Sequence, residues 1–242
     1  MPAWRRPAQA RAPCCSSWTS EGALSSRAVT VALHSIPGAA SLVAHAVLLE
    51  TGTPYRLVPV ERDARGRATA EYLALNPTGR VPTVVDGDAI LTEAAAICMH
   101  YADLHPAAGL APEVGTAERA QWYRWHCSLT NTVQPAFLRF FYPERYTIDP
   151  AASDGVQEQA IGELDEWRAR LDAQLSARPY LLGDACTTVD LFACMLTRWG
   201  RRLPTPWWSA PNLAAHFRRV ADRPSMRRVW EIDELDRDGE PG

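Results

Sequence analysis

Two serines enclose a short loop near the start of the chain. Ser35 and Ser41 flank Ile-Pro-Gly-Ala-Ala, between the apolar run VTVALH and the helix-patterned segment LVAHAVLLE. If a helix begins near Ala40 or Ser41, its first backbone N–H groups have no partner within the helix and point towards the loop. A serine there can cap the helix or donate its own proton. Because the loop holds no cysteine or tyrosine, any chemistry must come from hydroxyl and backbone N–H groups.

A second candidate stretch is Asn-Pro-Thr-Gly-Arg-Val-Pro, which ends at Pro82. An X-Pro bond is cis in about 5–6% of folded cases, far more often than any other peptide bond, so Val81–Pro82 is a candidate for a cis turn. Glu93 follows a short hairpin pattern and precedes an alanine-rich helical pattern. Its carboxylate either complements the positive end of that helix or pairs with a cationic ligand.

A small sheet must position these residues. Residues 29–34 and 53–61 are patterned as strands, and Gly52 ends the helix between them, so a right-handed crossover makes the two strands parallel. A polar stretch with helical tendency follows at 64–76. The segments TVV and AIL then flank Asp86-Gly87-Asp88, and an Asp-Gly pair favours a tight hairpin. Residues 92–104 are predicted to form a helix, with Thr92 as a candidate N-cap.

The second half of the chain is helical in pattern. Apolar residues recur every three or four positions between 153 and 177, which predicts one long amphipathic helix. Thr187 and Asp190 have the spacing of a capping box. A Pro-, Gly- and Ala-rich stretch separates the two halves. We therefore expect a disordered extension over 1–28, an α/β domain over 29–105, a linker over 106–115 and an all-helical domain over 116–242.

Composition narrows the class of protein. The 242 residues are 47% hydrophobic, enough for a buried core, and their net charge of -3 gives no bulk attraction to nucleic acid or to an anionic membrane. No apolar run reaches the roughly 18 residues of a spanning helix. Every basic residue is arginine, which excludes chemistry that needs a lysine amine. The six cysteines lack zinc spacing, so we expect reduced, mostly buried thiols, no metal site and a cytoplasmic protein acting on small molecules.

The order of these motifs resembles the glutathione S-transferase family. The resemblance rests on the Pro-Gly loop before the first helix, NPTGRVP before the hairpin, TEA at the last helix of the first domain, and LLGDACTTVD in the helical half. It covers roughly residues 29 to 235, and the loop is most similar to that of the bacterial β-type enzymes. It implies a thioredoxin-like α/β domain followed by an all-α domain.

The resemblance implies glutathione as co-substrate. The backbone of Val81 would pair with the cysteinyl part of glutathione, and Glu93 would pair with its γ-glutamyl ammonium. The residues expected to bind glutathione are Ala40, Arg80, Val81, Pro82, Glu93 and Ala94. The chain also departs from the family. Ala40 and Ser35 stand where β-type enzymes carry Cys and Tyr, Ala94 replaces a common Ser, and Gln134-Pro135 falls where they carry a His-Lys pair.

Such an enzyme must ionise the glutathione thiol near neutral pH. A free thiol has a pKa of about 8.5, and each unit of lowering requires about 1.4 kcal/mol. A helix start contributes about 0.3 to 2 kcal/mol and a hydroxyl a similar amount, so together they supply about one to two units. Ser41 is our first candidate for the hydroxyl and Ser35 the second. The alternative for Ser41 is an N-cap without a catalytic role.

The helical half would hold a small hydrophobic electrophile. Pro135 is expected to kink its helix and open room beside an aromatic-rich stretch. The candidate substrate-binding residues are Arg124, Gln134, Phe137 and Tyr142. The leading hypothesis is a homodimeric glutathione transferase. A non-catalytic relative that binds a protein partner is the alternative, which the departures at Ala40, Ala94 and Pro135 favour and the retained Val81-Pro82 and Glu93 oppose.

Overall fold

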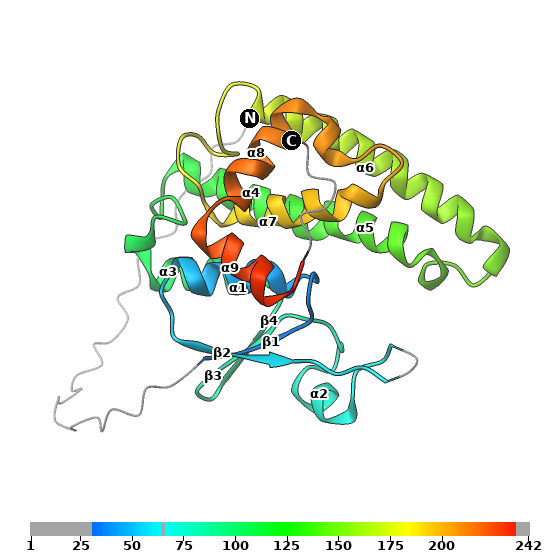
Figure 1. The fold of residues 1–242 in the computed structure, drawn as a ribbon, viewed down its shortest axis with the longest axis horizontal. Helices are drawn as coiled ribbons and strands as arrows, with labels where there is room; N and C mark the ends of the chain where they lie inside the picture. Colours follow the sequence, from blue (N-terminus) through cyan, green and yellow to red (C-terminus); the bar gives the residue numbers. More distant parts are fainter. Residues whose placement is uncertain (1–30, 64–65, 236–242) are drawn as a thin grey trace, which may run out of the picture.

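Four short strands form the sheet of the first domain. In the computed structural model, which describes residues 31–63 and 66–235, they follow the order β2-β1-β3-β4 (Figure 1). Their bounds are β1 (Val31–Ser35), β2 (Tyr55–Pro59), β3 (Thr83–Asp86) and β4 (Ala89–Thr92). β1 and β2 are parallel, as the crossover predicts, and β3 and β4 form the expected antiparallel hairpin, in which Gly87 takes a φ of 58°. The predicted extension over 1–28 lies outside the described residues.

The strand register gathers three segments at one end of the sheet. His34 of β1 pairs with Thr83 of β3, and Thr83 pairs in turn with Thr92 of β4. The residues that come next at this end are Ser35, Pro82 and Glu93. The sheet therefore places the first loop, the Val81–Pro82 turn and the Glu93 helix start side by side.

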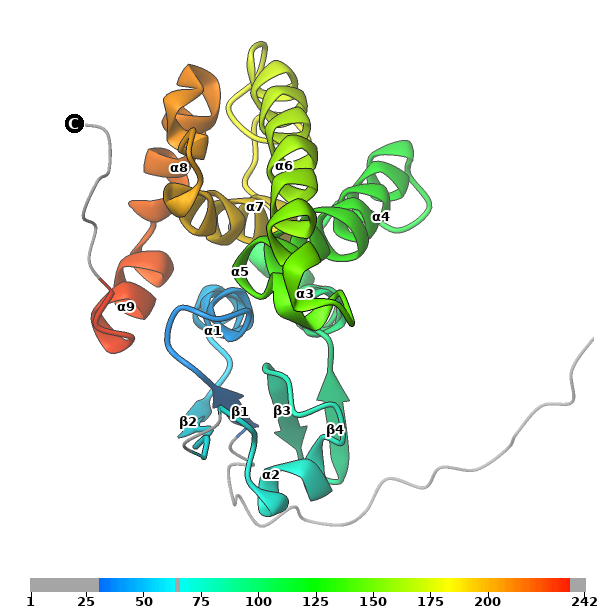
Figure 2. The same ribbon diagram turned by 90° about the vertical axis from the view of Figure 1, so that its right-hand side faces the viewer.

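Two helices cover one face of the sheet and separate it from the helical domain (Figures 1 and 2). They are α1 (Ser41–Glu50) and α3 (Ala94–Leu104), while α2 (Ala70–Leu75) lies against the other side of the sheet. Residues 41–48 of α1 are all buried, because the helix contacts α3, α7 and α9 as well as the sheet. The expected N-cap of α3 is wrong by one residue. Thr92 ends β4, and Glu93 takes the N-cap position.

The helical domain begins with a long, interrupted helix. Its helices are α4 (Ala117–Ser128), the π-helical η2 (Leu129–Val133), α5 (Gln134–Phe141), α6 (Ser153–Leu175), α7 (Thr188–Trp199), α8 (Pro211–Ala221) and α9 (Pro224–Ile232). Short 3-10 turns lie at η1 (Pro106–Ala108), η3 (Pro143–Arg145), η4 (Pro150–Ala152), η5 (Gly200–Arg202) and η6 (Trp207–Ser209). The π segment η2 lies just before Pro135, where the sequence predicts a kink, and proline has no N–H to donate to the preceding turn. α6 is the predicted amphipathic helix.

α7 is the centre of the helical domain. All of its residues, from Thr188 to Trp199, are buried, and the core that surrounds it continues through α1 into the first domain. Among the described cysteines, Cys98, Cys186 and Cys194 are buried, Cys127 is exposed, and all four are free. No described helix is both long and apolar enough to cross a membrane.

Candidate active site

Two helix starts at the gathered end of the sheet are open. The N-cap of α1 is Ala40 and that of α3 is Glu93, and no side chain of the described residues accepts from the first N–H groups of either helix. The Leu42 N–H of α1 donates to the Ala39 carbonyl at 3.0 Å. The Glu93 backbone has a φ of 69°, an uncommon value for a residue with a side chain. Both helix starts therefore present the positive end of a helix dipole, and N–H donors without intrahelical partners, at the same end of the sheet.

Ser41 is buried and holds the loop in place. Its Oγ donates to the carbonyl of Ile36 at 3.0 Å and accepts from the Ile36 N–H at 3.1 Å. The hydroxyl proton is therefore already donated. Ser41 is the first residue of α1 and not its N-cap, so the N-cap alternative is wrong, and a role for its hydroxyl beside the thiol stays a prediction.

Ser35 ends β1 and is also buried, and its backbone carbonyl accepts from Val60 at 2.9 Å. Within 31–63 and 66–235, no partner is found for its hydroxyl. Ala40, where a β-type enzyme would carry its cysteine, is 7% exposed. The methyl group of Ala40 thus leaves only backbone donors at the start of α1.

The Val81–Pro82 peptide is cis, as the motif indicates. A buried polar pair fixes the residue before it. Tyr72 of α2 donates to the Arg80 carbonyl at 2.6 Å, and the Asn76 amide donates to the same oxygen at 2.9 Å and to Thr83 at 3.0 Å. Asn76 belongs to the NPTG motif, whereas Tyr72 carried no signal of this role in the sequence. Both residues position the turn and leave the Arg80 side chain exposed.

Glu93 and Ala94 face the same region in different ways. The Glu93 side chain is exposed, and none of the described residues forms an ion pair with it. Ala94 is 5% exposed and begins α3. A carboxylate beside an open helix start offers one group for a cation and one set of N–H donors for an anion. A zwitterionic ligand matches both.

The helical domain clamps the loop before α1 at Gly38. The Asp233 carboxylate accepts from the Gly38 N–H at 3.1 Å, and the Trp199 indole N–H donates to the Gly38 carbonyl at 2.9 Å. Burial raises the pKa of Asp233, while the Gly38 N–H and the charge of Arg198 act to lower it. The sequence analysis missed this clamp, because Trp199 and Asp233 lie in a different domain and belong to no motif.

Aromatic rings of α5 and α7 pack beside this loop. The ring of Phe137 lies 6.0 Å from Trp199 and 5.0 Å from Trp207, measured between centroids, and Phe141 lies 6.4 Å from Trp199. The structure corrects the expectation for Phe137, which is 0% exposed and belongs to the core rather than to a binding surface. Phe141 is the partly exposed member of the group.

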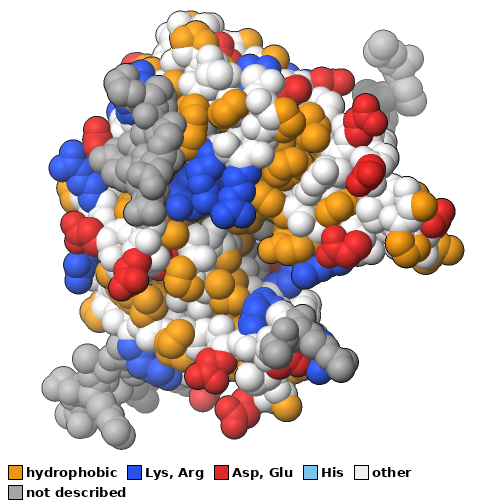
Figure 3. Space-filling model, turned by 45° about the vertical axis from the view of Figure 1, so that its right-hand side comes forward, with side chains coloured by type: hydrophobic (Ala, Val, Ile, Leu, Met, Phe, Trp, Pro, Cys, Tyr) orange, Lys and Arg blue, Asp and Glu red, His pale blue; other side chains and the backbone are white. Residues whose placement is uncertain are grey.

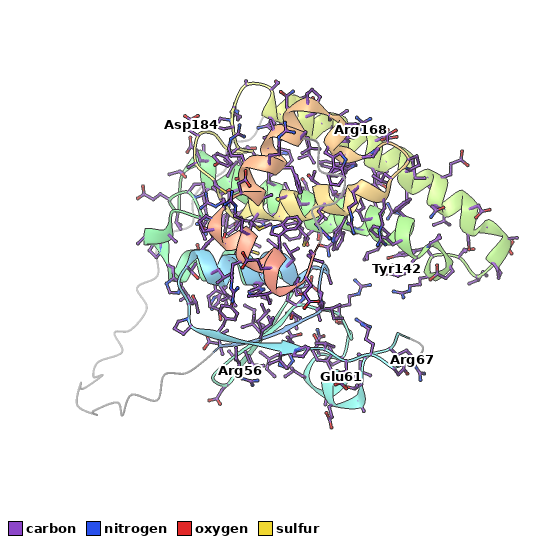
Figure 4. The ribbon with its side chains drawn as sticks, viewed as in Figure 1. Arg56, Glu61, Arg67, Tyr142, Arg168 and Asp184 are labelled. Atoms are coloured by element: carbon purple, nitrogen blue, oxygen red, sulfur yellow. The ribbon has the colours of Figure 1, made fainter. Side chains whose placement is uncertain are left out.

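The other expected substrate residues divide between two places. Gln134 begins α5 and is half-buried, and Tyr142 follows α5 with 40% exposure and the Arg145 guanidinium 4.0 Å from its ring. Figure 4 shows Tyr142 at the edge of the helical domain that faces the sheet domain, whereas Asp184 and Arg168 lie at the opposite edge. Figure 3 shows a hollow between the helical domain and the sheet domain.

Arg124 lies elsewhere. It bonds Gln121 at 2.7 Å and stacks on Trp125, in a cavity of about 360 Å³ between α4 and the end of α6. Gln134 is ten residues further along the same interrupted helix, a rise of about 15 Å. The expected grouping of Arg124 with Gln134 is therefore corrected. Arg124 is exposed, and the sequence did not indicate the contact of its guanidinium with the Trp125 ring, 4.5 Å from the ring centroid.

Known proteins share this arrangement. The glutathione S-transferase N-terminal domain model matches residues 29–103, and the C-terminal domain model matches 129–224. Glutathione S-transferase GST-4.5 of Xanthomonas campestris is 32% identical over 84% of this chain and 98% of its own length. A sphingomonad glutathione S-transferase complexed with glutathione has a TM-score of 0.74 at 29% identity, covering 85% of this chain and 100% of that chain.

A beta-class enzyme is among the similar structures. The glutathione S-transferase of Sphingomonas chungbukensis has a TM-score of 0.75 at 29% identity, over 85% of this chain and 100% of that chain. Both domain models match in order, and the identity extends over most of the chain. This protein is therefore a member of the glutathione S-transferase family.

Proposed function

We propose that this protein is a glutathione transferase that activates the glutathione thiol for attack on a small apolar electrophile. The observation that carries the proposal is the meeting of two uncapped helix starts and the exposed Glu93 at one end of the sheet. A tripeptide with an ammonium, carboxylates and an ionisable thiol has complementary groups for each. The similar sphingomonad structure holds glutathione.

Glutathione would lie across the end of the sheet. The γ-glutamyl ammonium pairs with Glu93, and the adjacent carboxylate accepts from the N–H groups at the start of α3. The backbone of Val81 pairs with the cysteinyl unit as an added strand would. The sulfur then reaches the start of α1. Holding the thiol there also orients it towards an electrophile against the helical domain.

The thiolate is stabilised, in this proposal, chiefly by the backbone N–H groups at the start of α1. The Ser41 hydroxyl would have to leave Ile36 before it could donate to sulfur, whereas Ser35 has no such bond to give up. Ser41→Ala is expected to lower the free energy of unfolding by about 1 kcal/mol and to leave the pKa of the bound thiol unchanged. Ser35→Ala is expected to raise that pKa, which thiolate absorbance measures. If only Ser41→Ala raised the pKa of the bound thiol, Ser41 would be the residue whose hydroxyl stabilises the thiolate.

Two measurements test the function itself. The protein should be retained on immobilised glutathione and should conjugate a chlorinated nitrobenzene, with glutathione consumption in step with chloride release. Retention without turnover would support the alternative, a non-catalytic binding module. If the protein were neither retained on immobilised glutathione nor active with the chlorinated nitrobenzene, glutathione would be excluded as its co-substrate.

We also propose a homodimer in the cytoplasm. Exposed apolar side chains at Ile90 of β4 and Tyr123 of α4, at 52% and 43% exposure, support an association surface. The free thiols are consistent with a reducing compartment. Sedimentation of the purified chain tests the dimer: a monomer at micromolar concentration would contradict it.

A further inference from the structure

Two neighbouring arginines follow α7 and have no acidic partner among residues 31–63 and 66–235. Arg201 and Arg202 form most of the turn η5, the first half-buried and the second exposed. Eight other arginines of the helical domain reach a carboxylate within 4 Å: Arg119, Arg139, Arg145, Arg168, Arg170, Arg223, Arg227 and Arg228. Neither Arg201 nor Arg202 has such a partner in the part of the chain that the structure describes.

The pair lies beside the proposed sulfur position. Trp199 donates to the carbonyl of Gly38 in the loop before α1, and an Arg198 nitrogen lies 3.6 Å from where a side chain on Gly38 would begin. Arg201 in turn donates to the Arg198 carbonyl at 2.9 Å. Arg201 and Arg202 therefore follow, within one turn, the residues that contact the loop.

Aromatic rings pack against the same turn. A Cβ on Gly200 would lie 2.5 Å from Cγ of Trp207, so only glycine lets this ring pack against the end of α7. Trp207 and Trp199 are buried, at 0% and 9% exposure, whereas Phe141, whose ring lies 6.4 Å from that of Trp199, is partly exposed. Figure 3 shows basic side chains next to apolar ones beside the hollow between the domains. Phe141 thus offers a partly exposed apolar ring next to the residue before this turn.

The electrostatics of the pair favour an anion. Burial lowers the pKa of Arg201, and the charge of Arg202 lowers it further. Two close cations repel each other, and a carboxylate between them removes the repulsion and accepts hydrogen bonds from both planar groups.

We propose that Arg201 and Arg202 bind a carboxylate on the second substrate, so that the preferred electrophile is an aromatic acid. This inference rests on the proposed function and specifies its substrate class. For a chlorinated nitrobenzoate, the thiolate sulfur forms a bond to the ring carbon and the C–Cl bond breaks, with the electron pair leaving on chloride and the thiol proton going to solvent. The arginines hold the carboxylate away from the reacting carbon.

A matched pair of electrophiles tests the proposal. We would compare 4-chloro-3,5-dinitrobenzoate with its neutral carboxamide, in wild-type protein and in the Arg201→Gln/Arg202→Gln double variant. The expected result is a fall in kcat/KM of about ten- to hundredfold for the acid and little change for the amide. Arg178→Gln, another arginine without an acidic partner, is the control, since it lies by the α4–α6 cavity. Equal losses on both substrates, or none on the acid, would overturn the inference.

Binding separates this inference from the proposed function. If the wild-type protein turns over neither electrophile, the proposed transferase activity fails, and tryptophan fluorescence then reports the affinity for the glutathione conjugate of each. Tighter binding of the acid conjugate, lost in the double variant, supports the arginine site. Equal affinities for the acid and amide conjugates refute it.

Discussion

The starts of α7 and α8 in the helical domain contrast with those of α1 and α3 in the sheet domain. In the helical domain, Asp190 accepts from the Thr187 N–H at 2.8 Å at the start of α7, and Asp172 of α6 accepts from the Asn212 and Leu213 N–H groups at 2.8 and 3.0 Å at the start of α8. In the sheet domain, α1 and α3 begin without any such acceptor. Carboxylates of the chain accept from the starts of the first two helices, and in the proposed function a ligand takes this place at the other two.

The same physical groups therefore serve folding at α7 and α8, and we propose that they serve binding at α1 and α3. Every helix start has donors without intrahelical partners and a positive dipole end. Buried starts must be satisfied from within the chain, and Asp190 is 0% exposed. Starts at an open end of the sheet can receive an anion from outside. Substitutions at the closed helix starts and then at the open ones test this contrast.

Opening α7 should have the largest effect. Asp190 also accepts from Leu181 N–H at 2.8 Å and contacts His216 at 3.0 Å. Asp190→Ala leaves all of these groups buried and unpaired, so we expect the free energy of unfolding to fall by about 3–5 kcal/mol. Urea denaturation measures it. Asp184 is exposed and takes no part in the capping box, so Asp184→Ala should cost under about 0.5 kcal/mol. A loss below about 1 kcal/mol for Asp190→Ala would contradict the importance of closure.

The clamp at the start of α9 should have the next largest effect. Glu50 of α1 accepts two bonds of 2.7 Å from Arg223 and one from Ser225. Burial opposes ionisation of Glu50, but these bonds and the charge of Arg223 lower its pKa overall. We expect Glu50→Gln to lower the free energy of unfolding by about 1.5–2 kcal/mol at neutral pH.

The same clamp has a defined pH dependence. Because the folded-state pKa of Glu50 is depressed, its stabilisation is complete above the unfolded value of 4.5 and is lost as the pH falls through the lower folded value. The gap between wild type and Glu50→Gln should therefore shrink below that pH. Glu231→Gln, which removes an exposed ion pair with Arg228, is the control and should change stability by under about 0.5 kcal/mol. A gap that widens in acid would contradict the assignment.

Local pattern was enough to predict the closed start of α7 and most of the fold, whereas the closure of α8 by Asp172, 40 positions before Asn212, was not predicted. The Thr187 and Asp190 spacing predicted the capping box of α7, and Asp-Gly predicted the hairpin, because both features involve residues a few positions apart. The clamp on Gly38 joins residues about 160 and 195 positions apart, so no spacing could reveal it. The placement of Ser41 was missed for a different reason: its partner, Ile36, is a backbone group without side-chain specificity.

At the open end of α3, the charge of Glu93 can be removed without changing its shape. Glu93→Gln keeps the uncommon backbone conformation and its cost, so any effect reports the ligand. We expect the KM for glutathione to rise about tenfold, with little change in kcat at saturation. Glutathione lacking the γ-glutamyl amino group should bind both proteins equally. Equal discrimination by both proteins would show that Glu93 does not meet the ammonium. Glu71→Gln, exposed on α2, is the control.

The smallest change adds a donor to the open end. Ala94→Ser places a hydroxyl at the first residue of α3, beside the N–H groups that we expect to receive the γ-glutamyl carboxylate. One hydrogen bond to a charged group, less the competition of serine with the helix backbone, should tighten glutathione binding about three- to tenfold. Calorimetry measures the affinity. Ala96→Ser, two residues further along α3, should not improve the affinity for glutathione. If Ala94→Ser raised stability without improving affinity, its hydroxyl would be closing α3 as Asp190 closes α7, and the ligand would lie elsewhere.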